Sequence, residues 1–182
     1  MGTILAVIVA VVVVVLGLRQ IKKESGVANA KLPLLLPLIQ GEVQKGQVLG
    51  RYLDLPARGL TFTRRVNDET HQHWWSTQVQ LGTTAAWDLV YAGKGLMGLG
   101  QKEVLVKAKD KELKARLEAS GLLQYMEQVP HVLEGKADLG MGYGWLCFNV
   151  RIKDGGDIPT PEAFQSYLQV LADVLPMVRE AP

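Results

Sequence analysis

An uninterrupted apolar stretch near the N-terminus limits the possible folds of this chain more than any other feature. Residues Ile4 to Leu18 read ILAVIVAVVVVVLGL and contain no polar side chain. As a helix this stretch covers about 22 Å, and including Met1 to Thr3 extends it to about 27 Å, close to the ~30 Å hydrocarbon core of a bilayer. A helix in lipid bonds its backbone groups internally. We therefore predict a transmembrane anchor over residues 1–18, which contacts the lipid bilayer through residues 4–18.

A secretory signal peptide is the main alternative to an anchor, because its apolar core has a similar length. No Lys or Arg precedes the apolar stretch, whereas Arg19, Lys22 and Lys23 follow it. Ala28-Asn29-Ala30 is similar to a cleavage site, but charged residues separate it from the apolar core. We favour an uncleaved, single-pass anchor. The positive-inside rule then places the N-terminus outside and the C-terminal domain in the cytoplasm, with Arg19, Lys22 and Lys23 at the membrane surface.

The charge of the chain is concentrated beside the apolar stretch. Residues 1–31 carry a net charge of +3 and residues 32–182 a net charge of −1, which together give the formal +2. A nucleic-acid-binding domain needs clustered positive charge to neutralise phosphates. We therefore expect no nucleic-acid partner. Cys147 is the only cysteine, which excludes an intrachain disulfide and a zinc site built from cysteines.

Residues 19–43 form a basic, Pro/Leu-rich juxtamembrane linker in our interpretation. The stretch KLPLLLPLIQG at 31–41 is strongly apolar, but Pro33 and Pro37 prevent a second spanning helix. Its leucines would be costly if they were exposed. They are expected to lie at the membrane interface, against a partner, or against the domain that follows. That domain is predicted to span residues 44–182.

Apolar and polar residues alternate in short stretches of this domain, the period of half-buried strands. In 58–66 (RGLTFTRRV), Leu60 and Phe62 alternate with threonines. In 144–152 (GWLCFNVRI), the even positions from Leu146 to Ile152 are apolar, and the odd positions include Cys147. The same period predicts further strands over 73–82, 84–92 and 103–108.

Two helical regions complete the prediction. Asp110 is suited to cap a helix over KELKARLEAS, which Gly121 ends or bends, and LLQYMEQV continues to Pro130. The second helix has Thr160 as its N-cap and Pro161 at its first position, and Pro176 is expected to stop it. Its apolar stripe is Phe164, Leu168, Leu171 and Leu175. The order of elements predicts an α+β fold, a mainly antiparallel sheet with two helices packed on one face.

The stretch YAGKGLMGLG contains a G-x-G-x-x-G at Gly93, Gly95 and Gly98. A dinucleotide-binding fingerprint needs a helix after these glycines, but QKEVLVKA reads as a strand. The chain also lacks the H-R-D and D-F-G sequences of protein kinases. We interpret the glycines as a long hairpin connection. Its apolar residues Leu96, Met97 and Leu99 either fold back on the core or contact lipid or a partner.

Candidate catalytic chemistry is sparse. Asp68, Glu69, His71 and His73 lie close together in DETHQHWW, and the two histidines would share a face of a strand, as metal ligands do. An ordinary polar turn has the same composition. Cys147 lacks an evident base and is interpreted as a structural thiol. We assign no catalytic, cofactor-binding or metal-binding residue and expect no cofactor.

Tryptophan supplies the most partner-like feature. Trp74 and Trp75 are adjacent, so a strand would direct them to opposite faces. One of them, Trp74, is either covered by a helix or exposed as an interface anchor. The sequence therefore favours a membrane-anchored, non-catalytic binding or assembly module that contacts a protein partner through Trp74, Leu96, Met97 and Leu99. The alternatives are a membrane-tethered hydrolase or metal-dependent enzyme that uses Asp68, Glu69, His71 and His73, and a peripheral lipid-sensing domain.

Overall fold

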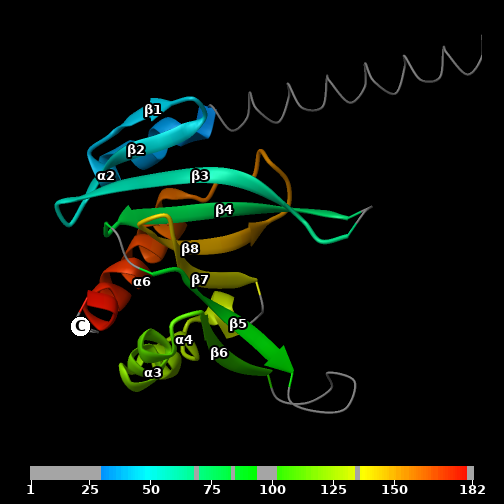
Figure 1. Ribbon diagram of the computed structural model, residues 1–182. Helices are drawn as coiled ribbons and strands as arrows, with labels where there is room; N and C mark the ends of the chain where they lie inside the picture. Colours follow the sequence, from blue (N-terminus) through cyan, green and yellow to red (C-terminus); the bar gives the residue numbers. More distant parts are fainter. Residues whose placement is uncertain (1–29, 68–69, 83–84, 94–101, 134–135, 180–182) are drawn as a thin grey trace, which may run out of the picture.

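The fold is α+β, with an eight-stranded antiparallel sheet and several helices (Figure 1). The computed structural model describes residues 30–67, 70–82, 85–93, 102–133 and 136–179. The predicted class and the antiparallel sheet are confirmed. The predicted anchor, residues 1–18, lies outside the described residues. No helix within the described part of the chain is both long and apolar enough to cross a membrane.

Every neighbouring pair of strands in the sheet is antiparallel, and the strand order is β1-β2-β3-β4-β8-β7-β5-β6. The strands are β1 (Glu42–Gln44), β2 (Gln47–Tyr52), β3 (Leu55–Arg65), β4 (His71–Gln80), β5 (Trp87–Gly93), β6 (Lys102–Ala108), β7 (Ala137–Gly142) and β8 (Trp145–Ile152). The first four strands form a meander. The last strand, β8, then returns to pair with β4, where Trp75 lies opposite Val150.

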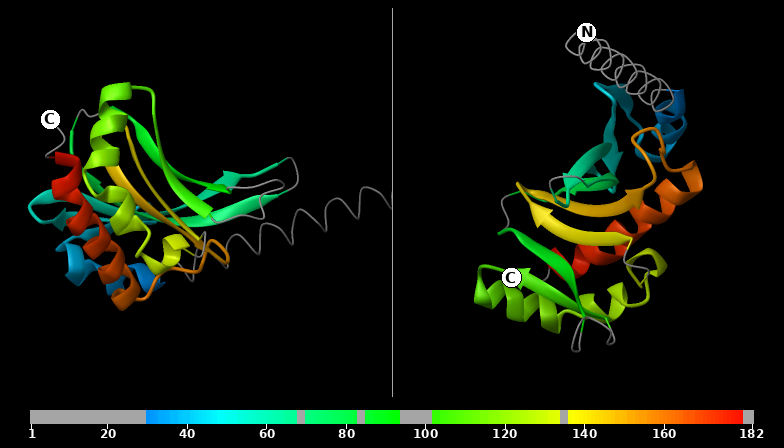
Figure 2. Two further views of the ribbon diagram at one scale, coloured as in Figure 1. Left: turned by 90° about the horizontal axis from the view of Figure 1, so that it is seen from below. Right: turned by 90° about the vertical axis from the view of Figure 1, so that its right-hand side faces the viewer.

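The helices gather on one side of the twisted sheet (Figure 2). They are the 3-10 helix η1 (Leu32–Leu35) and the α-helices α2 (Leu36–Ile39), α3 (Lys111–Ala119), α4 (Leu122–Met126), α5 (Pro130–Leu133) and α6 (Pro161–Arg179). The longest, α6, packs against the central strands β4 and β8. There the rings of Trp75 and Phe164 meet edge to face, with centroids 5.8 Å apart. This side of the sheet therefore holds the hydrophobic core.

Both predicted N-caps are confirmed. The carboxylate of Asp110 accepts hydrogen bonds from the backbone N–H groups of Glu112 and Leu113, 2.9 and 3.2 Å away. The hydroxyl of Thr160 accepts one from the N–H of Ala163, 3.3 Å away. These bonds satisfy N–H groups that a helix start leaves without a partner.

The predicted end of the second helix is wrong, because α6 continues through Pro176 to Arg179. A proline removes one backbone hydrogen bond and crowds the preceding turn. Burial opposes that cost, since Val178 is 7% exposed and Met177 packs against the core. The last turn of α6 is therefore held by its tertiary contacts.

The Pro/Leu-rich stretch packs on the domain, one of the three positions considered for it. Leu32, Leu35 and Ile39 are completely buried, so the packed part of the chain extends N-terminal of the boundary predicted at residue 44. Glycines permit this contact. A Cβ on Gly50 would lie 2.1 Å from the carbonyl oxygen of Ile39, closer than any real contact. The backbones of α2 and β2 therefore approach as closely as they do only because residue 50 is glycine.

The short strands β1, β2 and β7 were not predicted. β7 was missed because Gly140 and Gly142 lie within it, and glycine is rare in strands. Its hairpin with β8 turns at Tyr143-Gly144, with φ of 53° and 80°, and β2 turns into β3 at Leu53-Asp54, with φ of 49° and 63°. Positive φ at both central residues is the signature of the tight type I′ turn. Tyr143 and Leu53 occupy conformations for which glycine or asparagine is usual.

Candidate interaction face

On the side of the sheet opposite the helices, polar, charged and aromatic side chains from four strands lie together. None of the described helices crosses strands β3, β4, β8 and β7 on this side (Figures 1 and 2). We call this surface the open face. Its side chains come from alternate positions of the strands: Arg58, Leu60, Phe62 and Arg64 of β3; Trp74, Ser76 and Gln78 of β4; Trp145, Cys147, Asn149 and Arg151 of β8; and Asp138 and Gly140 of β7.

Six of these side chains form a continuous hydrogen-bonded row, which we call the polar chain. Arg58 Nε donates to Gln78 Oε1 (2.6 Å), Gln78 Nε2 to Ser76 Oγ (2.8 Å), Ser76 Oγ to Asn149 Oδ1 (2.6 Å), Asn149 Nδ2 to Asp138 Oδ1 (2.6 Å), and Arg64 Nη1 to Asp138 Oδ2 (2.8 Å). The row crosses four strands, and each of its two ends is a guanidinium. Because every bond fixes the next side chain, the groups on this face are held in place before any partner binds.

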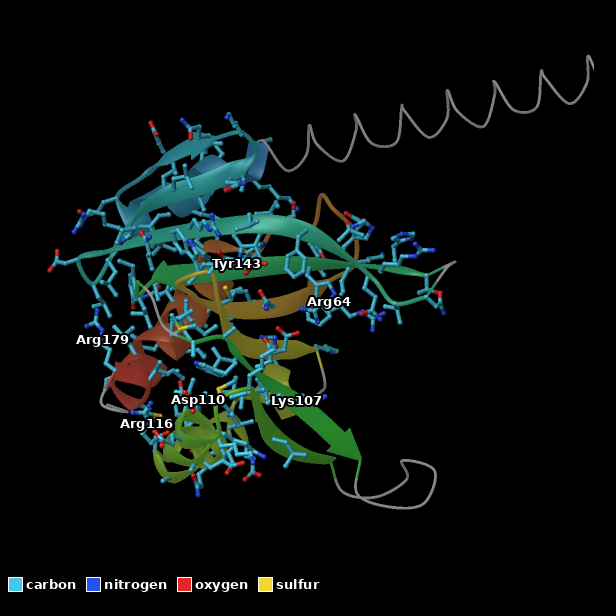
Figure 3. All side chains as sticks on the ribbon, in the orientation of Figure 1. Arg64, Lys107, Asp110, Arg116, Tyr143 and Arg179 are labelled. Carbon is cyan, nitrogen blue, oxygen red and sulfur yellow. The ribbon has the colours of Figure 1, made fainter. Side chains whose placement is uncertain are left out.

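Each terminal arginine lies over an aromatic ring. The guanidinium carbon of Arg58 is 3.9 Å from the ring centre of Trp145, and that of Arg64 is 4.6 Å from Trp74. Phe62 and Trp74 also stack, with centroids 6.4 Å apart. Figure 3 labels Arg64, whose side chain reaches from β3 across β4 and β8 to Asp138 on β7. Stacked guanidinium groups keep their edges available for hydrogen bonds.

Arg64 and Phe62 cover the ring of Trp74 in these stacks. The prediction left open whether a helix covers Trp74 or the ring is exposed. Trp74 is 6% exposed, and its cover comes from Arg64 and Phe62 instead of a helix. Its indole nitrogen has no hydrogen-bond partner among the described residues. The partner-binding role of Trp74 stays a prediction, but contact with a partner would require Arg64 to move.

Leu60 and Phe62 face this side as well, although a half-buried strand usually directs its apolar residues to the helix-covered core. In the register of β3 and β4, Phe62 lies opposite Trp74 and Leu60 opposite Ser76. The helix side of β3 is filled by Gly59 and Ala57 instead, because a Cβ on Gly59 would lie 2.4 Å from the ring of Trp75. The alternation therefore predicted the strand correctly. It could not predict which face of the strand is turned to the core, because that depends on the ring of Trp75 beside Gly59.

Cys147 lies in the middle of the open face, opposite Gln78 on one side and Gly140 on the other. Its thiol donates to the backbone oxygen of Trp145, 3.5 Å away. Burial raises the pKa of the Cys147 thiol to about 11, and the nearby Arg58 only partly offsets that effect. The thiol is therefore protonated at neutral pH, which fits the structural role we expected for it.

A cavity of about 660 Å³ borders the open face where β5 and β6 meet the start of α3. Asp88, Lys107 and Lys114 line it beside the indole of Trp87. Burial raises the pKa of the Asp88 carboxyl, the charge of Asp138 adds to the rise, and Arg64 and Lys107 oppose it. Figure 3 labels Lys107 on β6. The carboxylate of Asp110, also in the lining, is engaged as the cap of α3.

The histidines of the enzyme alternative lie together on β4, as their spacing predicted. His71 is exposed, and His73 is partly buried with its Nδ1 3.4 Å from the hydroxyl of Thr63. Asp68 and Glu69 lie outside the described residues. No group of three His, Cys, Asp or Glu side chains in the described part of the chain could hold a metal ion.

Several other predicted positions cannot be placed. Leu96, Met97 and Leu99, and the basic residues Arg19, Lys22 and Lys23, lie outside the described residues. The flanks of the glycine stretch are described, however. β5 and β6 pair in antiparallel register, with Gly93 opposite Lys102. A strand therefore follows the glycines where a dinucleotide-binding fingerprint needs a helix.

The sequence did not predict the polar chain or the full exposure of Tyr143, two residues before the partly buried Trp145. The signal that was available was the spacing of Arg58 and Arg64, which the period of a strand places on one face. Nothing local shows that β8 is the neighbour of β4.

In comparisons with known proteins, no family model, no curated protein and no solved structure matches this chain.

Proposed function

We propose that this protein is a non-catalytic binding or assembly module, held at the membrane by residues 4–18, whose open face binds a protein partner. The observation that carries the proposal is the stacked pair of Arg58 and Trp145 on that face, with the fully exposed Tyr143 two residues before Trp145, in the turn that leads into β8. Arg, Trp and Tyr are the residue types that dominate binding hot spots. Arg58 is already oriented by Gln78 and by the ring of Trp145, so little conformational entropy is lost when it binds.

The backbone conformation of Tyr143 costs folding free energy, and this cost supports the proposal. Its side chain is fully exposed, and its backbone has a φ of 53°. A non-glycine residue in this conformation costs about 1 kcal/mol, and no burial offsets the cost here. Residues that violate a local folding preference without a structural gain are concentrated at functional sites. The exposed ring is explained if it contacts another protein.

The chemistry of Arg58 and Trp145 favours a partner segment that carries carboxylates. The Nε of Arg58 is used by Gln78, which leaves the two terminal nitrogens of the guanidinium for a ligand. A guanidinium that lies flat on an aromatic ring can bond a carboxylate along its free edge. The aromatic rings of Tyr143 and Trp145 then supply apolar contact area beside the ion pair.

Photo-crosslinking of the full chain in its native membrane tests this proposal. We expect p-benzoylphenylalanine at position 143 to capture one discrete protein, whereas the same group at Gln165, exposed on α6, captures none. Trp145→Ala should reduce the yield at position 143 at least about tenfold, since hot-spot residues contribute 2 kcal/mol or more. Arg179→Gln, an exposed change on α6, is the matched control.

Equal crosslinking from positions 143 and 165, or a yield that Trp145→Ala leaves unchanged, would exclude the open face as the binding surface. Trp74→Ala is not suitable for this test. Trp74 is buried, so its removal would lower stability and partner binding together.

A further inference from the structure

The helices η1 and α2 carry apolar side chains on the side that is turned away from the core. Their inner side packs on the sheet, whereas Pro33, Leu34 and Pro37 are exposed on their outer side, Leu34 at 60%. Val43 of the neighbouring strand β1 pairs with the buried Val48, so it points to the helix side of the sheet, where it is 36% exposed. We call Pro33, Leu34, Pro37 and Val43 the apolar patch. A helix that is apolar on all sides is normally buried on all sides.

The starts of both helices are suited to an apolar environment. A helix start leaves backbone N–H groups without partners, and a polar N-cap side chain usually satisfies one of them. Neither η1 nor α2 has such a cap. Pro33 and Pro37 stand in the first turns instead, where proline has no N–H to leave unpaired, and the N–H of Leu36 donates to the carbonyl oxygen of Pro33. The two helices therefore offer few polar backbone groups that would oppose contact with lipid.

The position of the apolar patch in the chain favours a bilayer as its occupant. The apolar stretch that we predict to be the anchor ends at Leu18, and residues 19–31 span at most about 45 Å when fully extended. The patch therefore belongs to the part of the described chain that follows the anchor most closely. Lys31, exposed just before η1, adds a positive charge that anionic lipid headgroups attract.

A protein partner fits the apolar patch less well. Trp, Tyr and Arg dominate protein binding hot spots, whereas Leu is under-represented in them. The patch contains only proline, leucine and valine. Acyl chains are fluid, so they accept such side chains without a surface of matching shape, and the contact is favourable in proportion to the apolar area that it removes from water.

We propose that the apolar patch docks the domain on the surface of the bilayer, with Leu34 inserted between the lipid headgroups. The inference rests on the membrane anchor of the proposed function, and it adds the orientation of the domain. The patch lies on the helix side of the sheet near its β1 edge, and β6 forms the opposite edge (Figure 1). Docking through the patch therefore leaves the open face free of lipid and accessible to a protein partner.

Spin labelling of the full chain in nanodiscs of phosphatidylcholine and phosphatidylglycerol tests this docking. Leu34→Cys places a label in the patch, and Leu53→Cys is the matched control, since Leu53 is a 56% exposed leucine in the turn between β2 and β3. Both proteins carry Cys147→Ala, so that each has one thiol. Oxygen is concentrated in lipid, and nickel ethylenediamine diacetate in water. We expect collisions with oxygen to dominate at position 34 and collisions with nickel at position 53, because interfacial segments lie roughly 5–10 Å deep in the headgroup region.

A charge in the patch separates docking from anchoring. With the label on Val43→Cys, Leu34→Glu should lower the ratio of oxygen to nickel collisions about tenfold, because a carboxylate opposes transfer into the interface. Leu53→Glu, the control for an added charge, should leave that ratio unchanged. Both charged variants should stay in the nanodiscs through residues 4–18. Leu34 is exposed, so its substitution leaves the core intact.

The docking proposal is overturned if position 34 is as accessible to the nickel reagent as position 53 while the protein is retained in the nanodiscs. It is also overturned if the label at position 34 is shielded from both reagents, because a protein partner or a second copy then covers the patch. Loss of the protein from the nanodiscs would overturn the anchor and the docking together. The crosslink at Tyr143 reports on the open face alone, so its absence leaves these measurements unaffected.

Discussion

Individual residues of the open face are buried without any helix above them. Ser76 and Gln78 are 0% and 9% exposed although their alternation with Trp75 and Val79 assigns them to the solvent side of β4. Burial of such groups is costly unless each finds a hydrogen-bond partner. Ser76 both accepts from Gln78 and donates to Asn149, so neither side chain is left unpaired. The open face is thus a second, polar layer of packing.

Cys147 provides a test at this scale. With a thiol pKa of about 11, its thiolate fraction at pH 8 is roughly a hundredfold lower than for a thiol of pKa 9. We expect its alkylation by iodoacetamide to accelerate until the pH passes about 11. The double variant Cys147→Ala/Gln165→Cys, with its thiol exposed on α6, should react with an ordinary profile.

The same pKa has a consequence for stability. The native thiol keeps its proton to a higher pH than the unfolded chain does, so its contribution is complete below pH 9 and is lost as the pH rises to about 11. The free energy of unfolding of the wild type should therefore fall more steeply between pH 9 and 11 than that of Cys147→Ala. Parallel profiles, or alkylation at pH 8 as fast as in the control, would contradict burial of the thiol.

At the scale of elements, the N-terminal helices are attached to the sheet by backbone proximity as well as by side chains. Gly41 and Gly50 face each other, and a Cβ on Gly41 would lie 1.9 Å from the carbonyl oxygen of Leu49. The closeness allows Leu35 and Ile39 to reach the core, where both are completely buried. An element predicted as a linker is therefore part of the fold, because glycines on both sides admit it.

Gly50→Ala should consequently lower the free energy of unfolding by about 3 kcal/mol, because a methyl group forced against the Ile39 carbonyl displaces α2 from β2. Gly142→Ala is the matched control. A Cβ there meets nothing within 4 Å, and we expect a change of less than about 0.5 kcal/mol. Denaturation of the full chain measures both. A Gly50→Ala protein as stable as Gly142→Ala would show that α2 and β2 are not this close.

At the scale of the whole molecule, the sheet separates a face that is covered by helices from the open face. The helix side holds the hydrophobic core. The open face carries the polar chain and the stacked pair of Arg58 and Trp145. If residues 1–18 anchor the chain in a membrane, as we propose, the segment before Leu32 holds the open face near that membrane.

Protease protection tests that arrangement. We propose that the N-terminus is outside and the domain inside, so protease added to intact cells should leave residues 30–182 undigested, and permeabilisation should expose them. Intact-mass measurement provides the control, since an uncleaved anchor retains residues 1–29. Digestion from outside, or a mature chain that begins near Lys31, would overturn both the anchor and its orientation.

Much of the local structure was predictable from the sequence, because its causes are local. The alternation from Trp145 to Ile152 identified β8 and its two faces, and Asp110 and Thr160 marked the starts of α3 and α6. Where local rules conflicted with packing, packing decided the outcome. Pro176 lies inside α6 because Val178 is buried, and β7 has a glycine at position 140 because a Cβ there would lie 2.4 Å from the carboxylate of Asp88.

By itself, the sequence determined the α+β class, which residues share a face of each strand, and where the capped helices begin. Only the tertiary structure decided that β8 pairs with β4 and β7 with β8, and therefore that Arg58, Asn149 and Asp138 belong to one polar chain. The physical reason is that strands pair through backbone groups that every residue carries. The pattern of side chains along one strand therefore specifies its faces without specifying its neighbours.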